Sequence, residues 1–313
     1  MHTLEIPERK VFRQFASEIE EMTREEYIYF VELILKHMKW EITSPMLKVL
    51  LVRKLLGIKI NLKFFLLPKD AQEEINGEMF RLSEQMDSFF EDEIRDGQQV
   101  KSIRLEFVRN IIHEISPGYV GPADALADIT FCEYRIAHEF YRDYVNSRGE
   151  DALNRMIAVL YRPAKRFLWI RKLLPGYDGQ SRRKFTSRSN PLFLERRARK
   201  IDRLPMPIRY GIFLWFSGCE QYLVKGKPVI DGNEIDLSIL YKETEKTSPR
   251  EPNIGLVGLL YTLAESKVFG SIEETDNQNL YDVMARLYQV VLQQREMDEK
   301  FEKIKRNGSG KDI

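Results

Sequence analysis

Apolar residues recur every three or four positions over much of the chain, which is the spacing of one face of an α-helix. Thr23 and Glu26 have the spacing of a capping box, and the apolar stripe that follows them predicts a helix over 24–39. The same spacing predicts one long surface helix from Asp70 to Gly97. Much of the N-terminal part is therefore expected to be helical.

Strand-like alternation is limited to short stretches. Ile103, Leu105 and Phe107 alternate with charged residues, which favours a strand, although a helix that continues through Val108 fits the same residues. Proline and glycine then cluster over 117–122, where we expect a rigid turn to end the N-terminal region.

Two further helices are expected after this turn. An aromatic-rich stripe predicts one over 126–149, and an apolar stripe that begins at Asp151 predicts another, which Pro163 interrupts. The short polar link between them makes them an antiparallel pair. A helix is also predicted over 191–201, whereas 175–190 has almost no apolar content and is expected to be an exposed loop.

The C-terminal part begins with a polar stretch over 242–252 that contains two prolines and is typical of a linker. A short apolar helix is predicted over 254–264. Thr275 and Gln278 are expected to cap the last helix. Beyond Gln293 this helix becomes almost wholly charged, so we expect it to project into solvent and fray.

Together these patterns predict a mainly α-helical, multi-helix globular protein with few short strands and a basic surface loop. Three consecutive regions are expected: an N-terminal helical region over 1–118, a central helical domain over 119–245, and a C-terminal helical region over 246–313 with a frayed charged tail. The sequence has no apolar run typical of a signal peptide or a membrane span, so a cytoplasmic location is expected.

Charge is distributed unevenly along the chain. Between 161 and 209, 15 residues are Lys or Arg and three are Asp or Glu, so this basic segment carries +12 in a chain of net charge +1. A segment this basic must meet something anionic. We expect its cations to form an electrostatic partner-binding surface, made of Arg162, Lys165, Arg166, Arg171, Lys172, Arg182, Arg183, Lys184, Arg188, Arg196, Arg197, Arg199 and Lys200.

Three anionic partners remain open for the basic segment. They are acidic faces elsewhere in the same chain, an acidic surface of another protein, and nucleic-acid phosphate. Phe185 is the one aromatic residue within the loop at 180–190. Single-strand binding uses several stacked aromatic side chains, so this reading of the segment is disfavoured.

Sequence motifs for catalysis and cofactor binding are missing. There is no Gly-x-Ser-x-Gly elbow, His-Glu-x-x-His pair or Gly-x-Gly-x-x-Gly loop. Cys132, Glu133 and His138 form the nearest approach to a metal-ligand cluster, but a helix would spread them over different faces. We therefore expect a non-enzymatic protein with no cofactor and no metal; a hydrolase or transferase with a dispersed site would need a deep polar pocket.

Several runs of residues carry a family resemblance. Residues 121–134 and 157–163 resemble a pattern in uncharacterised proteins of tailed phages and prophages of Bacteroidetes. Residues 258–265, with the capped helix that follows, are similar to the C-terminal pattern of their tail-assembly-chaperone-like members. The resemblance covers about 119–293 and is one of hydrophobic and turn residues. Leu256 departs from it, because an aromatic residue is expected near that position.

This resemblance implies a non-enzymatic role in phage tail morphogenesis, as a tail assembly chaperone or a related structural component. Such a protein would bind and shield tail-tube or tape-measure subunits in the cytoplasm of the bacterial host, or remain in the virion. The implied partner is the acidic surface of another phage tail protein. Nucleic-acid binding through the basic segment at 161–209 is the alternative function.

Overall fold

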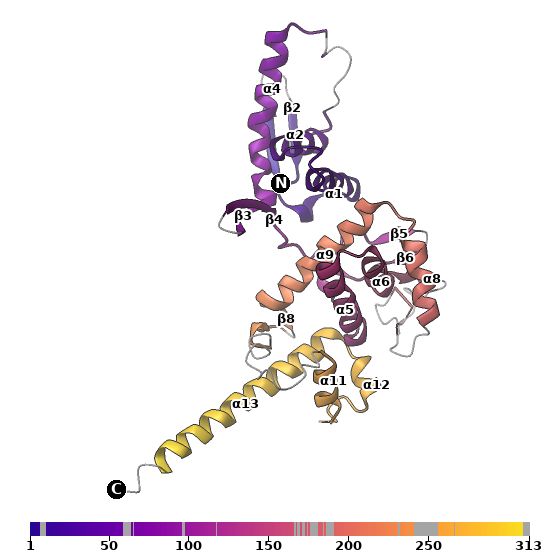
Figure 1. Ribbon diagram of the computed structural model, residues 1–313, viewed down its shortest axis with the longest axis vertical. Coiled ribbons are helices and arrows are strands. Elements are labelled where there is room, and N and C mark those ends of the chain that lie inside the picture. Colours follow the sequence, from indigo (N-terminus) through magenta and orange to yellow (C-terminus); the bar gives the residue numbers. More distant parts are fainter. Residues whose placement is uncertain are drawn as a thin grey trace. The chain divides into compact units, whose positions relative to one another are not determined.

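The computed structural model describes residues 1–308 apart from the positions 7–10, 59–63, 65, 96–97, 117, 166, 168–169, 171–172, 174, 176–180, 184, 186–190, 231, 241–255 and 266. The protein is mainly α-helical, with short antiparallel strands in small sheets, which confirms the predicted fold class (Figure 1). Within the described part of the chain, no helix combines the length and the apolar character that a membrane crossing requires.

The chain folds into two compact units. Unit 1 comprises Met1–Ile115 and Arg203–Gly218, and unit 2 comprises Ser116–Asp202 and Cys219–Ile313. This division differs from the three consecutive regions expected from the sequence. Residues 203–218, which follow the helix predicted over 191–201, belong to the same unit as the N-terminal region. The C-terminal region belongs to the same unit as most of the central one.

Unit 1 combines two β-hairpins with helices. Its core contains the buried faces of the first two helices, with Phe30, Val31 and Leu51 fully enclosed. The predicted first helix is confirmed, with the capping box between Thr23 and Glu26 in place. The elements are β1 (His2–Ile6), β2 (Val11–Phe15), η2 (Ile19–Glu21), α1 (Arg24–Met38), α2 (Ser44–Leu55), α4 (Lys69–Ser83), η3 (Glu84–Phe89), β3 (Phe90–Arg95), β4 (Gln98–Ile103) and the first part of α9 (Met206–Lys225). The strand β5 (Glu114–Ser116) contains the boundary between the two units.

The single long helix predicted from Asp70 to Gly97 is wrong beyond Ser83. The chain turns through η3 there and enters β3, which pairs antiparallel with β4. The rings of Phe89 and Phe90 lie 5.7 and 6.4 Å from that of Phe30, between ring centroids. Burial of both aromatic side chains against α1 therefore overrides the helical spacing.

The strand predicted from Ile103 to Phe107 is also wrong, because β4 ends where this pattern begins. The extended chain that follows packs against α9 instead. A Cβ atom at Gly218 would lie 2.2 Å from the Phe107 carbonyl oxygen, so only glycine fits there. Close packing at Gly218 therefore joins α9 to this extended segment. The indole of Trp215 donates a hydrogen bond of 2.8 Å to the Val108 carbonyl.

Unit 2 is built around α5 (Phe131–Ser147) and α6 (Glu150–Leu160), which pack against each other. Both helices predicted after the turn are present, but the first begins at Phe131 and not at 126. Gly118 has a φ of +81° within that turn. The elements are β6 (Tyr119–Val120), η4 (Asp124–Leu126), α5 (Phe131–Ser147), α6 (Glu150–Leu160), β7 (Arg162–Pro163), α8 (Pro191–Ile201), the last part of α9, β8 (Val229–Ile230), β9 (Asn233–Glu234), α11 (Leu256–Glu265), α12 (Ile272–Asp276) and α13 (Leu280–Gly308).

The capping expected at Thr275 is wrong. The capping box is formed by Ser271 and Glu274, and it begins α12, in which Thr275 is buried. The last helix begins only at Leu280 and remains helical through Gly308. The linker expected over 242–252 lies outside the described residues.

Candidate partner-binding surface on α8

The helix α8 has two chemically different faces. Ala198 and Ile201 are buried and lie on the side that packs against α6. At the edge of this contact, Arg155 Nε of α6 lies 3.0 Å from Glu195 Oε1 of α8, and both side chains are about 40% exposed. The apolar spacing over 191–201 therefore gives the predicted helix a defined inward face.

The outward face carries apolar and basic side chains together. Leu192 and Phe193 are 62% and 59% exposed in the first turn. Arg196, Arg199 and Lys200 are exposed in the next two turns. These five residues, called here the α8 surface, recur at the spacing of one side of a helix. Exposed aromatic and arginine side chains in one patch are typical of protein-binding surfaces.

Two of the predicted partner-binding cations are instead buried in the interior of unit 2. Arg162 is 2% and Arg182 0% exposed, so the expectation that they form part of a surface is wrong. Arg162 forms an ion pair with Glu133, through its Nη2 and the carboxylate Oε1. Arg182 Nη2 lies 3.6 Å from the other oxygen of the same carboxylate. The acid that neutralises them belongs to the chain itself.

Arg182 also fixes the backbone around it. Its Nη1 donates to the Leu160 carbonyl at 2.8 Å, at the end of α6, and its Nη2 lies 3.0 Å from Asp128 Oδ1. The Asp128 oxygen in turn accepts a 2.7 Å hydrogen bond from the Ala123 amide. One guanidinium therefore ties together three segments that are distant in the sequence.

The burial of this ion-pair cluster perturbs its ionisation. Burial raises the pKa of Glu133, although Arg162 and Arg182 both act to lower it. Burial likewise lowers the pKa of Arg162 to about 10, against the attraction of Glu133. Each charge is thus tolerated in the interior because the opposite charge accompanies it.

The loop predicted as exposed over 175–190 is anchored where the structure describes it. Ala164 pairs with Arg182 in an isolated antiparallel bridge, and the Arg183 amide donates to the Pro163 carbonyl at 3.0 Å. The buried ring of Phe185 lies 6.0 Å from the guanidinium carbons of Arg162 and of Arg197. Backbone pairing and the buried ring of Phe185 therefore hold this part of the loop against the rest of unit 2.

The remaining predicted cations divide into three groups. The first group is exposed and consists of Arg183 and the three cations of the α8 surface. The second group is half-buried and includes Lys165. Arg197 is half-buried, and burial lowers its pKa. The positions of five others lie outside the described residues: Arg166, Arg171, Lys172, Lys184 and Arg188.

A second polar cluster in unit 2 was not predicted from the sequence. Glu220 Oε2 of α9 accepts a hydrogen bond from the Tyr134 hydroxyl at 3.2 Å and lies 3.0 Å from His138 Nδ1. Tyr134 and His138 share a helix face at i, i+4, but their partner is about 80 residues distant in sequence. Only tertiary packing brings the three groups together.

The potential metal cluster on α5 is dispersed, as the helical spacing predicts. Cys132 is buried, and burial raises the pKa of its thiol; Glu133 and His138 face different partners. Among the described residues, no three His, Cys, Asp or Glu side chains are placed to hold a metal ion.

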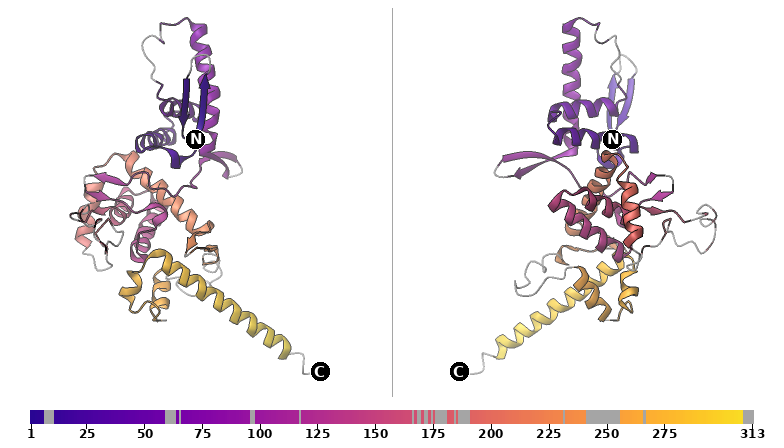
Figure 2. Two further views of the ribbon diagram at one scale, coloured as in Figure 1. Left: turned by 180° about the vertical axis from the view of Figure 1, so that it is seen from behind. Right: turned by 45° about the vertical axis from the view of Figure 1, so that its right-hand side comes forward.

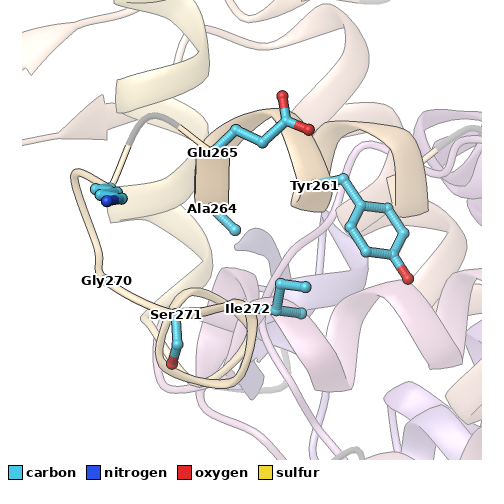
Figure 3. A pocket seen from close by; sticks show the side chains of 7 residues that line it. Tyr261, Ala264, Glu265, Gly270, Ser271 and Ile272 are labelled. Atoms are coloured by element: carbon cyan, nitrogen blue, oxygen red, sulfur yellow. The ribbon is translucent and has the colours of Figure 1, made fainter.

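An open pocket of about 510 Å³ lies beside α11 and α12. Figure 3 shows Tyr261, Ala264 and Glu265 of α11 on one side of it and Ser271 and Ile272, at the start of α12, on the other. Glu265 is the acidic group of its lining. The pocket is lined by none of the predicted site residues.

Comparisons with protein-family models, with curated proteins and with solved structures found no match to this chain.

Proposed function

We propose that this protein is a non-enzymatic binding component of phage tail morphogenesis, a tail assembly chaperone or a related structural component, and that it holds its client on the α8 surface. The observation that carries the proposal is the pairing of exposed Leu192 and Phe193 with the exposed cations of the same helix face. The assignment to tail assembly rests on the sequence resemblance over about 119–293.

The chemistry of the α8 surface sets the class of client. Two exposed apolar side chains supply contact area that gains free energy when covered, at about 25 cal/mol per Å². The cations beside them attract an acidic partner and orient it, because complementary charge mainly increases the association rate and the specificity. An amphipathic helix with an acidic edge, displayed by a tail-tube or tape-measure subunit, fits both requirements.

The test is a pull-down from phage-infected or lysogenic cells with three forms of the protein. The wild-type chain should recover a virion protein. Combined charge reversal of Arg196, Arg199 and Lys200 to Glu should lower the recovery at least about tenfold, because rim charges become repulsive. The matched control reverses three exposed lysines elsewhere in unit 2, Lys225, Lys227 and Lys267, and should bind as the wild type does.

Two results would count against the proposal. The first is recovery of no virion protein by the wild-type chain. The second is DNA binding in a gel-shift assay that weakens steeply between low and moderate salt and is lost in the triple α8 variant, since counterion release is the signature of phosphate binding. Proteomics of purified particles then separates the two forms of the proposal, because a chaperone is absent from the virion and a structural component is present.

A further inference from the structure

The second half of α13 is an exposed helical segment. Val283, Met284 and Leu287 in its first turns are buried, but Leu292 is 37%, Met297 48% and Phe301 68% exposed. The views of Figures 1 and 2 show this helix extending away from the other elements of unit 2. From residue 292 to its end it is about 25 Å long, at 1.5 Å per residue.

This exposed segment continues the spacing of the apolar repeat in the buried part, with Gln294 as its one polar member. The positions Leu280, Val283, Leu287, Val290, Gln294, Met297, Phe301 and Ile304 are separated alternately by three and four residues. A repeat with this average spacing of 3.5 residues is the heptad pattern of a coiled coil, in which these are the a and d positions. Leu292 lies outside the stripe, at the f position.

A helical end that packs against nothing gains little stability, because helices in proteins are stabilised mainly by packing of an apolar face. Here Met297 and Phe301 stay exposed. A facing helix with the same repeat would enclose them by inserting knobs into holes. Gln294 is the one polar residue among these positions in the exposed half, and a single polar residue at an a position sets the register and the number of strands.

The charge order of the segment identifies the partner. Over 295–299, three residues are acidic and one is basic, whereas over 300–306 four are basic and one is acidic. Two copies aligned antiparallel bring the acidic turn of each against the basic turns of the other, and a two-fold axis satisfies both contacts at once. A parallel alignment places like charges side by side.

From the heptad repeat and this charge order we infer that α13 mediates self-association of the protein as a two-stranded antiparallel coiled coil. The site is the stripe that contains Met297 and Phe301, and its occupant is the same stripe of a second copy. This inference concerns the assembly of the protein and does not depend on the proposed client.

Sedimentation equilibrium of the full-length chain tests the inference. The wild-type chain should dimerise reversibly. Joint substitution Met297→Asp and Phe301→Asp should raise the dimer dissociation constant more than tenfold, because unpaired carboxylates would be buried in the seam. Leu292→Asp, which places the same charge on an exposed apolar site at the f position, should leave the constant unchanged. All variants should melt at the wild-type temperature as dilute monomers, because the altered side chains are exposed.

Disulfide trapping tests the direction of the two helices. In an antiparallel seam an a residue faces a d residue, so Met297→Cys in one copy and Phe301→Cys in a tagged copy should form a mixed disulfide when oxidised together. The native cysteines, Cys132 and Cys219, are buried and should not compete. A wild-type chain that remains monomeric at high concentration, a dimer that tolerates the double Asp substitution, or disulfides that join identical positions in preference would overturn the inference.

Discussion

A single buried carboxylate, that of Glu133, holds much of the interior of unit 2 together. Its two oxygens lie against Arg162 and Arg182, and its position at the start of α5 also places it in a capping box with Thr130. The role of Glu133 is therefore both local, at a helix end, and tertiary, at the centre of three converging segments. Arg162 depends on it, and Arg182 shares its charge between Glu133 and Asp128, because an uncompensated charge in a protein interior is strongly unfavourable.

We predict that Glu133→Gln destabilises the protein by about 3–5 kcal/mol, because it leaves the buried Arg162 without its counter-charge and removes one of the two carboxylates beside Arg182, whose other partner is Asp128. Urea denaturation followed by circular dichroism measures the change. Glu195→Gln serves as the control: it removes a half-exposed ion pair with Arg155 in the same unit and should cost less than about 1 kcal/mol. Equal losses of unfolding free energy in the two variants would show that the buried cluster stabilises the protein no more than a half-exposed ion pair does.

A second residue-scale prediction concerns Gly218. Gly218→Ala should destabilise the protein by at least about 1–3 kcal/mol, because its Cβ would overlap the carbonyl oxygen of Phe107. This oxygen belongs to the backbone, so no side-chain rotation can relieve the overlap. Gly77→Ala is the matched control. No atom lies within 4 Å of the added Cβ there, and alanine favours the helix α4, so this change should stabilise by up to about 1 kcal/mol. Thermal melts of the two variants should therefore shift in opposite directions.

At the scale of elements, the capping boxes define where helices begin, and the one at Ser271 is sensitive to pH. Hydrogen bonds from the Ser271 amide and hydroxyl lower the pKa of Glu274 below its ordinary value of 4.5. A carboxyl whose folded-state pKa is lowered stabilises the fold fully above its unfolded-state pKa. This contribution is lost as the pH falls through the lower, folded-state value.

We therefore predict that α12 loses its N-terminal cap in acid. In an NMR titration the Ser271 amide shift should report a midpoint below 4.5, and Ser271→Ala should return the Glu274 midpoint toward that value, measured on its side-chain carbonyl. Glu274→Gln should weaken hydrogen-exchange protection of α12 at pH 6, and this difference from the wild type should shrink as the pH falls through the measured midpoint of Glu274, because the native carboxyl then loses its charge. A wild-type midpoint at or above 4.5 would contradict the prediction.

At the scale of the whole molecule, unit 1 is completed by a segment from much later in the chain. The Tyr27 hydroxyl donates to the Gly211 carbonyl at 2.8 Å, and Trp215 bonds to the backbone at Val108. Both contacts are buried or partly buried. Unit 1 thus depends on the first half of α9, and the N-terminal part by itself lacks a portion of its core.

A fragment experiment checks this dependence. Residues 1–115 alone should unfold without a cooperative transition, because the apolar surface that α9 covers becomes exposed. The same residues joined through a flexible glycine–serine linker to 203–218 should unfold cooperatively, with a change in Trp215 fluorescence. A replacement of Trp215 by Phe in the joined fragment controls for the signal of Trp40. Cooperative unfolding of 1–115 at the same midpoint would refute the dependence.

The sequence contained most of the helices, because their signals are local. Apolar spacing and cap chemistry placed α1, α5, α6 and α8, since the hydrogen bonds of a helix and its cap join residues three or four positions apart. Two predicted helix ends, at Ser83 and at Thr275, were wrong because tertiary burial decides them: Phe89 and Phe90 are buried beyond the first, and Thr275 is itself buried inside α12.

The candidate site, too, could be predicted only where its signals are local in the sequence. The exposed cations of α8 could be predicted, because a helix with one apolar face must turn its charged residues outward. The burial of Arg162 and Arg182 could not, because composition counts charges without showing which acid each one meets. Their partners, Glu133 and Asp128, lie 29 to 54 residues away in sequence, and only the folded backbone brings these groups within ion-pairing distance.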